Sequence, residues 1–402
     1  MTHTATQALE AAADIVHNLA YPDQFARTEA SDHSLASGAA GISLLHSERA
    51  ASGHDDWASA HTWLTTALSG DLSAGDEAGL FFGAPACAFA AHFATRTRPG
   101  ILTRALSQLD TSISELTRRR LAAAHTRIDR GHLAAFREYD LMRGLTGIGA
   151  YHLRRNHHDS TRAVLSYLVR LTHPGPDGLP GWWVDHAPSP DDPDPAFTPG
   201  HANLGMAHGI AGPLALLAQA ARRGITVAGH FDALDRVCAW LDTWQQPHPA
   251  GPWWPYWITR AQLRGNASVA GPGRPSWCYG TPGLARAQQL AALALRDTAR
   301  QRTSEAALLG CLTDPKQRSS LTEPGLCHGL AGLLQTTWRM AEDAVIEDLG
   351  EHLPLLITRL TEHRHTDSPE FLTGAAGIAL TLHTTTAAST DSCVWDTSLL
   401  LS

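Results

Sequence analysis

The chain has 402 residues, of which 43% are hydrophobic and 17% are charged, a balance that suits a globular protein with a sizeable core. Its formal net charge is −8 and it has no long basic run, so nucleic acid is not an expected partner. The sequence has neither a signal-peptide pattern nor an apolar run long enough to span a membrane, so we expect a soluble, cytoplasmic protein.

One short pattern returns along the chain: a glycine, two residues, usually a second glycine, and then an apolar run with helical spacing. The copy at Gly83 departs from the pattern, because Ala86 stands where the second glycine is expected. An isolated Gly-x-x-Gly is a weak signal, whereas seven copies in register are a strong one. The copies begin at Gly38, Gly83, Gly144, Gly209, Gly280, Gly329 and Gly374.

More polar segments with helical spacing alternate with these copies, with apolar residues on one face and charges on the other. They are residues 6–20, 54–69, 103–126, 160–172, 230–245, 299–312 and 345–363. A helix that is apolar all round requires burial, whereas an amphipathic helix suits a surface. We therefore predict an all-α fold, an α/α toroid (barrel) with seven inner and seven outer helices. One repeat cannot bury its apolar face alone, so residues 1–402 should form a single domain.

Two stretches rich in Pro, Gly and Trp lengthen the spacing between copies, at about 173–200 and 246–275. We expect long loops or short strands there, inserted into the toroid. Long loops of a compact domain often form lids or binding surfaces, so these stretches are candidates for peptide contact. Ordered packing over the end of the toroid is the alternative.

The chain has six cysteines, and in a large cytosolic protein metal binding or reactivity is favoured over a disulfide framework. Cys278 and Cys327 each lie two residues before the glycine of their copy, so both thiols should meet at one rim, and His328 follows directly. Two sulfurs and one imidazole fit zinc and leave its fourth position open. The alternatives are that these cysteines are small buried hydrophobic residues, or that Cys311 or another histidine completes a structural site.

Two further polar residues should face the same rim. His208 directly precedes the glycine of the fourth copy, and Asp140 lies shortly before Gly144. A histidine there can act as a general acid or base, and a carboxylate can orient it or exchange a proton with a substrate. Either residue could instead be a satisfied structural polar group.

Together these residues resemble the lanthionine synthetase C-like family, and the resemblance covers essentially the whole chain. The pair of Trp-Cys-Tyr-Gly and Cys-His-Gly is highly specific, and Ala86 lies far from both motifs. The matching motifs are Trp277-Cys278-Tyr279-Gly280 with Pro282-Gly283, Cys327-His328-Gly329, Gly205-Met206-Ala207-His208-Gly209, Tyr139-Asp140 before Gly144, and Arg274 four residues before Cys278.

The resemblance implies a toroid with one catalytic Zn²⁺ bound by Cys278, Cys327 and His328. It implies a cyclase of lanthipeptide and antibiotic biosynthesis, which adds cysteine thiols to dehydroalanine or dehydrobutyrine in a dehydrated precursor peptide that carries a leader. The products are (methyl)lanthionine thioether rings. The implied partners include a separate dehydratase and an exporter, through which the protein would associate with the membrane.

The resemblance also implies roles for four other residues. His208 is the expected proton donor to the enolate formed by thiol addition, and Asp140 would assist this transfer. Arg274 and Tyr279 would stabilise or position the enolate or the metal ligands.

Other functions are compatible with parts of the pattern. A protein of this family could add a small thiol such as glutathione to an electrophile, or bind zinc and peptides without catalysis. A toroidal glycosidase or terpene cyclase would need an acidic pair or an aspartate-rich metal motif at the rim. Asp140 has no convincing acidic partner in the sequence, and Cys-His-Gly would have no purpose there.

Overall fold

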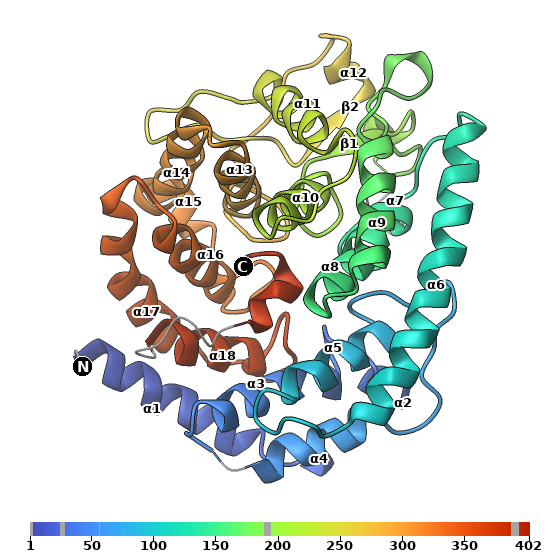
Figure 1. Cartoon of the computed structure of the whole chain (residues 1–402). Coiled ribbons are helices and arrows are strands. Elements are labelled where there is room, and N and C mark those ends of the chain that lie inside the picture. The colour runs from blue at the N-terminus through green and yellow to red at the C-terminus, as the bar shows by residue number, and fades with distance from the viewer. Residues whose placement is uncertain (1–2, 25–28, 56, 189–193, 387–393) are drawn as a thin grey trace.

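An inner ring of apolar helices forms the centre of the protein (Figure 1). The structure, a computed structural model, describes residues 3–24, 29–55, 57–188, 194–386 and 394–402. Each inner helix begins directly after a repeat glycine or two residues later, as the sequence predicts. Within these ranges the seven inner helices are α3 (Ala39–Ala51), α5 (Ala84–Ala94), α8 (Leu145–Arg154), α10 (Ala211–Arg222), α13 (Thr281–Leu295), α16 (Leu330–Glu342) and α18 (Ala375–Thr386).

An outer ring of amphipathic helices surrounds the inner one (Figure 1). Each outer helix packs against an inner helix, and α1 closes the circle because it contacts both α17 and α18 while α18 contacts α3. The predicted α/α toroid is therefore confirmed. Within the described ranges the seven outer helices are α1 (His3–Asn18), α4 (Trp57–Ala67), α6 (Thr103–Asp129), α9 (His158–Leu171), α11 (His230–Thr243), α14 (Thr298–Thr313) and α17 (Leu353–Glu362).

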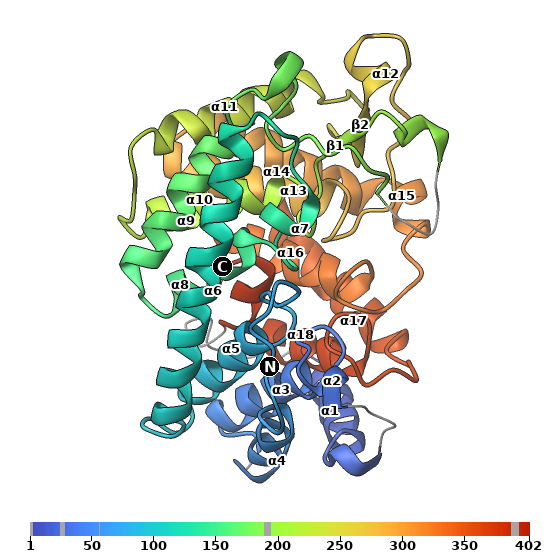
Figure 2. The ribbon, with the colours of Figure 1, turned by 90° about the vertical axis from the view of Figure 1, so that its right-hand side faces the viewer.

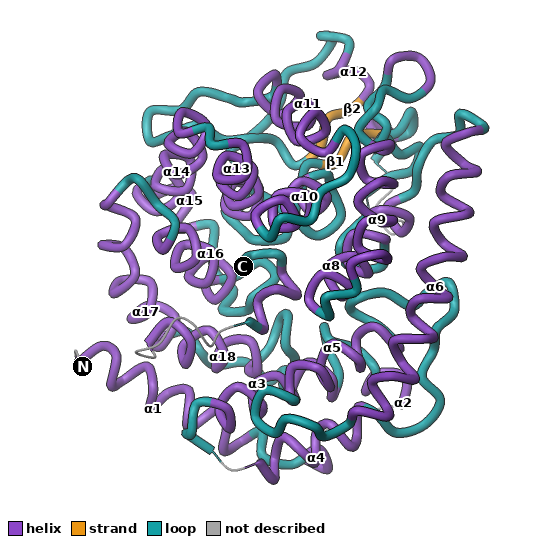
Figure 3. The backbone as a smooth tube through the Cα atoms, viewed as in Figure 1, coloured by secondary structure: helices purple, strands orange, loops and turns teal. Residues whose placement is uncertain are grey.

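Shorter elements lie in the connections. Strands β1 and β2 pair antiparallel with His201 opposite Thr259, and they are the orange segments of Figure 3. Figure 2 places β1, β2, α12 and α15 toward one end of the toroid, at the right of that view. The short elements are η1 (Pro22–Gln24), α2 (Glu29–Asp32), α7 (Phe136–Tyr139), η2 (Pro176–Gly178), η3 (Pro195–Phe197), β1 (His201–Asn203), β2 (Trp257–Thr259), α12 (Arg260–Leu263), α15 (Pro315–Ser319), η4 (Glu347–His352) and η5 (Trp395–Leu399).

The two Pro-, Gly- and Trp-rich stretches contain several of these elements. Residues 173–200 include η2 and η3, although 189–193 lie outside the described residues. Residues 246–275 include β2 and α12. Contact of either stretch with a peptide stays a prediction.

The turns that enter the inner helices are joined by backbone hydrogen bonds into a closed ring, which we call the collar. Each bond runs from one repeat to the next, between residues two or three positions before the repeat glycine. The N–H groups of the described residues donate to carbonyl oxygens 2.8–3.3 Å away. The seven pairs, donor first, are Leu35–Phe81, Phe81–Met142, Leu141–Ala207, Ala207–Cys278, Cys278–Cys327, Cys327–Leu372 and Leu372–Ala36.

The second glycine, which six of the seven motifs have, lets the collar lie close to the helices. A Cβ added to Gly283 would lie 2.0 Å from the carbonyl oxygen of Trp277, and one added to Gly332 would lie 1.9 Å from that of Leu326. No side chain fits at such distances, so at these two turns the chain can lie this close to the helix only over a glycine.

The C-terminal segment occupies the middle of the ring (Figure 1), where η5 contacts α8. The fully buried carboxylate of Asp396 accepts hydrogen bonds from Arg339 Nε at 2.6 Å and from Gln335 Nε2 at 2.7 Å, both on α16. The indole nitrogen of Trp277 donates to the carbonyl oxygen of Leu399 at 3.0 Å. The segment therefore supports the collar from inside, next to Cys278.

Gly332→Ala tests the contact between collar and helix. A glycine-to-alanine change in an open helical position stabilises a protein by up to about 1 kcal/mol. Here the added methyl group would collide with Leu326, so we expect a loss of about 1–3 kcal/mol in the free energy of unfolding. Chemical denaturation measures it, with Gly350→Ala as the control because a Cβ at Gly350 meets nothing within 4 Å. A Gly332 variant as stable as the wild type would show that the collar can move off the helix at no cost.

Candidate metal centre

Three predicted ligands come together at the collar. One ligand atom each from Cys278, Cys327 and His328 lies within 4.8 Å of the others. Across the described residues this is the one group of three or more His, Cys, Asp or Glu side chains placed to hold a metal ion. Cys278 is 6% exposed, and Cys327 and His328 are half-buried, so the group opens toward solvent on one side.

The collar explains why the two sulfurs meet. Cys278 and Cys327 are consecutive members of it, joined by the hydrogen bond from the N–H of Cys278 to the carbonyl oxygen of Cys327 at 3.1 Å. Side chains at equivalent positions of neighbouring repeats therefore emerge side by side. His328 follows in the chain, and its pKa is raised chiefly by a hydrogen bond to Cys278.

Hydrogen bonding within the group favours one thiolate. The hydrogen bond from Cys327 lowers the pKa of Cys278 to about 5 against the opposing effect of burial. The same hydrogen bond, together with burial, raises the pKa of Cys327. Ser276 Oγ, 3.9 Å from the sulfur of Cys278, also favours the thiolate.

The chemistry of the donor set fits zinc. Thiolate and imidazole ligands suit zinc, and three protein ligands with one open position are typical of catalytic sites. Cys311 does not belong to the group; it is buried in α14, where burial raises its pKa to about 12. The five described cysteines are free, and Cys393 lies outside the described residues.

His208 and Asp140 form a second pair on the collar. Asp140 Oδ2 lies 2.6 Å from His208 Nδ1. The carboxylate is 1% exposed, and its other oxygen accepts hydrogen bonds from the backbone N–H groups of Arg143 and Gly144, both at 2.7 Å. These bonds hold the carboxylate rigidly, so Nδ1 of His208 carries a proton and Nε2 remains for other partners.

Tyr279 adjoins both His208 and Cys278. It follows Cys278 in the chain, and its ring centroid is 6.2 Å from that of His208. Its hydroxyl oxygen accepts a hydrogen bond from Asn203 Nδ2 at 3.1 Å, and burial raises its pKa. Asn203 belongs to β1, so the small sheet fixes this tyrosine. The sequence patterns do not single out Asn203, because the contact spans 76 residues.

Arg274 reaches the group through Glu323, which is not among the residues that the sequence predicts for the site. Glu323 Oε1 lies 3.6 Å from Arg274 Nη1, and Glu323 Oε2 lies 2.8 Å from His328 Nε2. A signal for Glu323 exists in the repeat register, because Arg274 and Glu323 both lie six residues before their repeat glycines.

Comparisons with known proteins agree with this fold and these motifs. The family model of lanthionine synthetase C-like proteins matches residues 29–400. The chain belongs to this family.

This family member is also similar to individual known proteins and structures. The nisin biosynthesis protein NisC of Lactococcus lactis subsp. lactis is 24% identical over 204 residues, which cover 49% of this chain and 48% of that protein. The match thus spans about half the length of that relative. The solved structure of a nisin cyclase is similar with a TM-score of 0.82 and 20% identity over 97% of both chains, a likeness that shows the fold.

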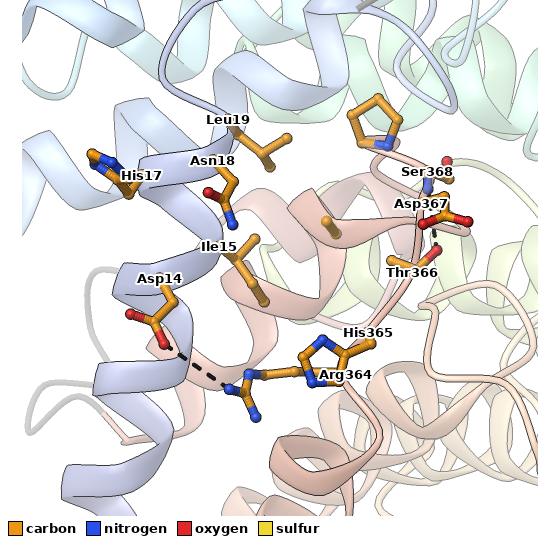
Figure 4. Close-up of a pocket in the computed structure, with 12 residues that line it drawn as sticks. Asp14, Ile15, His17, Asn18, Leu19, Arg364, His365, Thr366, Asp367 and Ser368 are labelled. Carbon is orange, nitrogen blue, oxygen red and sulfur yellow. Dashed lines mark hydrogen bonds and ion pairs between the residues drawn. The ribbon is translucent and has the colours of Figure 1, made fainter. Parts of the chain in front are cut away.

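We call Cys278, Cys327 and His328 the metal-centre group. Away from it, this lanthionine synthetase C-like protein has a polar groove of about 480 Å³ between α1 and the loop that enters α18 (Figure 4). The carboxylate of Asp14 on α1 lies 4.0 Å from the guanidinium of Arg364 on the loop. Asp367, on the same loop as Arg364, also lines the groove. None of the predicted site residues lines it.

Among the helices that the structure describes, none is long and apolar enough to cross a membrane.

Metal analysis of the purified lanthionine synthetase C-like protein tests the ligand group. We expect about one zinc per chain in the wild type, and loss of that zinc in Cys278→Ala and in Cys327→Ala because two ligands no longer suffice. Elemental analysis by mass spectrometry measures the content. Cys238→Ala, which removes a buried thiol of α11, is the control and should keep its zinc. Full zinc content in either site variant would exclude that cysteine as a ligand.

Proposed function

We propose that this protein is a zinc-dependent lanthionine synthetase. It adds cysteine thiols of a dehydrated precursor peptide to dehydroalanine or dehydrobutyrine residues of the same peptide, which forms thioether rings. The proposal rests on one arrangement: the group of Cys278, Cys327 and His328 shares the collar with the His208–Asp140 pair. A nucleophile and a proton are needed close together for this addition, and membership of the lanthionine synthetase C-like family supports it.

The metal-centre group serves to prepare the nucleophile. Zinc held by Cys278, Cys327 and His328 would supply a Lewis acid that lowers the pKa of a substrate thiol. The positive ends of α13 and α16, whose N-termini follow the two cysteines, favour negative charge at the same place.

The His208–Asp140 pair serves to complete the addition. When the sulfur bonds to the β-carbon, the π electrons of the alkene move toward the carbonyl group and form an enolate. The enolate must then gain a proton at its α-carbon. In this step His208 would donate the proton from Nε2, while Asp140 fixes Nδ1 and balances the charge of the ring. The proton lost by the thiol balances the one gained at carbon.

Tyr279 and Arg274 serve to stabilise charge. Because Asn203 donates to the hydroxyl oxygen of Tyr279, the tyrosine O–H is free to donate to an enolate oxygen. The guanidinium of Arg274 is 39% exposed, so it can reach a substrate while its ion pair with Glu323 directs it toward the metal-centre group.

The precursor peptide is best accommodated beside the small sheet. Trp257 of β2 has its ring 5.5 Å from that of Tyr279, so 246–275 adjoins the proposed site directly. Residues 173–200 adjoin it through the bridge between Val184 and His201 of β1. Both stretches would contact the peptide, and a leader, a separate dehydratase and an exporter would be further partners.

A glycosidase is not supported by this geometry. Hydrolysis of a glycosidic bond generally requires two carboxyl groups across the scissile bond. Asp140 is 1% exposed and bonded to His208, so its carboxylate orients an imidazole rather than facing a second acid.

The proton-transfer role is tested with His208→Asn and a synthetic peptide that contains one dehydroalanine and one cysteine. We expect the zinc content to stay at the wild-type level and the enzyme-dependent rate to fall by about 10²–10⁴-fold, because general acid–base catalysis contributes that much. Cyclisation leaves the mass unchanged, so residual thiol is alkylated and counted by mass spectrometry.

Two controls define the outcome. Enzyme-free peptide gives the background rate, and His61→Asn on the exposed part of α4 should react like the wild type. An unimpaired His208 variant would exclude His208 as the proton donor. Addition of glutathione to the dehydroalanine without ring formation would make the protein a small-thiol transferase instead.

A further inference from the structure

We propose that Glu323 is a positioning residue that orients His328 toward the metal and couples it to Arg274. The inference rests on the proposed function, because it concerns how the same metal centre is held. None of the motifs that identify the family contains this glutamate.

The contact with His328 has the geometry of an orienting hydrogen bond. Glu323 Oε2 lies 2.8 Å from Nε2 of His328. A carboxylate at this distance accepts the Nε2 proton, which leaves the lone pair of Nδ1 for the metal. A metal-bound histidine almost always donates its other ring N–H to such an acceptor, which fixes the tautomer, orients the ring and strengthens the ligand.

The backbone of Glu323 is fixed by the same helix that follows His328. Its carbonyl oxygen accepts a hydrogen bond from the N–H of Leu330 at 2.8 Å, at the start of α16. A Cβ on Gly329 would lie 2.3 Å from this oxygen, so the loop lies tightly against the turn. The carboxylate is therefore presented to His328 from a rigid position.

The repeat register explains why Arg274 joins the contact. Arg274, Glu323 and Ser368 lie six residues before Gly280, Gly329 and Gly374 respectively. In all three repeats the carbonyl oxygen of that residue lies within 2.5 Å of a Cβ built on the glycine. Positions that are equivalent in neighbouring repeats are adjacent on the rim, so Arg274 and Glu323 face one another, at 3.6 Å.

Stability does not account for this contact. The side chains of Arg274, Glu323 and His328 are 39%, 53% and 27% exposed. Ion pairs as exposed as these typically contribute between about 0 and 1 kcal/mol to folding. The consequence of the contact should therefore appear in metal binding rather than in unfolding.

The test compares zinc binding of the wild type with Glu323→Ala, Glu323→Gln and Glu370→Gln. Glu370→Gln is the matched control, because it removes the same charge from the loop before α18. The carboxylate of Glu370 accepts a hydrogen bond from the hydroxyl group of Thr373. Zinc affinity is measured by competition with a chromophoric chelator. The visible absorption of the cobalt(II)-substituted proteins reports the geometry at the metal independently of activity.

We expect Glu323→Ala to weaken zinc binding by about 10–100-fold, the usual effect of losing such a partner. Its cobalt(II) bands should shift in position and intensity. Glu323→Gln keeps an acceptor oxygen for Nε2, so it should lose less affinity than the alanine variant. Glu370→Gln should match the wild type in zinc affinity and in the cobalt(II) spectrum. Without metal, Glu323→Ala should unfold at the same temperature as the metal-free wild type.

Three results would overturn the inference. Wild-type affinity and cobalt spectra in both Glu323 variants would do so while leaving the proposed function intact. An equal loss in Glu370→Gln would show a general effect of charge on the rim. Absence of zinc from the wild type would overturn the proposed function together with this inference. If the alanine variant does not fold, the isosteric glutamine variant decides by the same criteria.

Discussion

The collar is the constraint on which the rest of the structure depends. Seven backbone hydrogen bonds close it within the described chain, and each occupies groups that would otherwise be unsatisfied where the chain turns into an inner helix. The bonds fix the turns relative to one another to within the tolerance of hydrogen-bond geometry. The proposed metal centre, whose ligands come from two turns, needs that precision, since thiolate and imidazole ligands must lie at defined distances from the metal. The outer helices and the C-terminal segment support the collar from outside and from within.

Two imidazoles at the rim are each held by a carboxylate, and the difference between the carboxylates is informative. Asp140 is buried and bonded by two backbone N–H groups, so it has little freedom and can hold His208 in one orientation. Glu323 is 53% exposed and shared with Arg274, so its effect on His328 depends on a surface charge pair. The carboxylate that holds His208 is thus insulated from solvent, whereas the carboxylate that holds His328 remains open to salt and to substrate charge.

The periodic part of the structure could be predicted from the sequence. Repeat glycines and alternating helical patterns gave the two rings, and the shared offset of Cys278 and Cys327 predicted their meeting. Contacts between repeats were not predictable in the same way. Asn203 reaches Tyr279 from a strand that no periodic signal marks, and Trp277 bonds to Leu399 across 122 residues. The C-terminal segment carries no copy of the motif, so no spacing indicates that it enters the ring. Glu323 could be predicted only by comparison with Arg274, because both lie six residues before their repeat glycines. The sequence alone does not show that this position matters.

The toroid has near-sevenfold repetition, yet the residues to which we assign its chemistry lie on one arc. Among the residues at the cysteine position of the other repeats, Phe81, Ala207 and Leu372 offer no ligand. Asp140, His208, Cys278 and Cys327 come from four consecutive repeats, the third to the sixth, so the His208–Asp140 pair and the sulfurs are neighbours along the collar. The enclosing fold therefore supplies a similar hydrogen-bonded turn in every repeat, and in the proposed function the side chains on each turn decide which turns take part. A peptide bound along this arc would meet the metal ligands and His208 in sequence, which suits a reaction whose nucleophile and proton must arrive at adjacent carbon atoms.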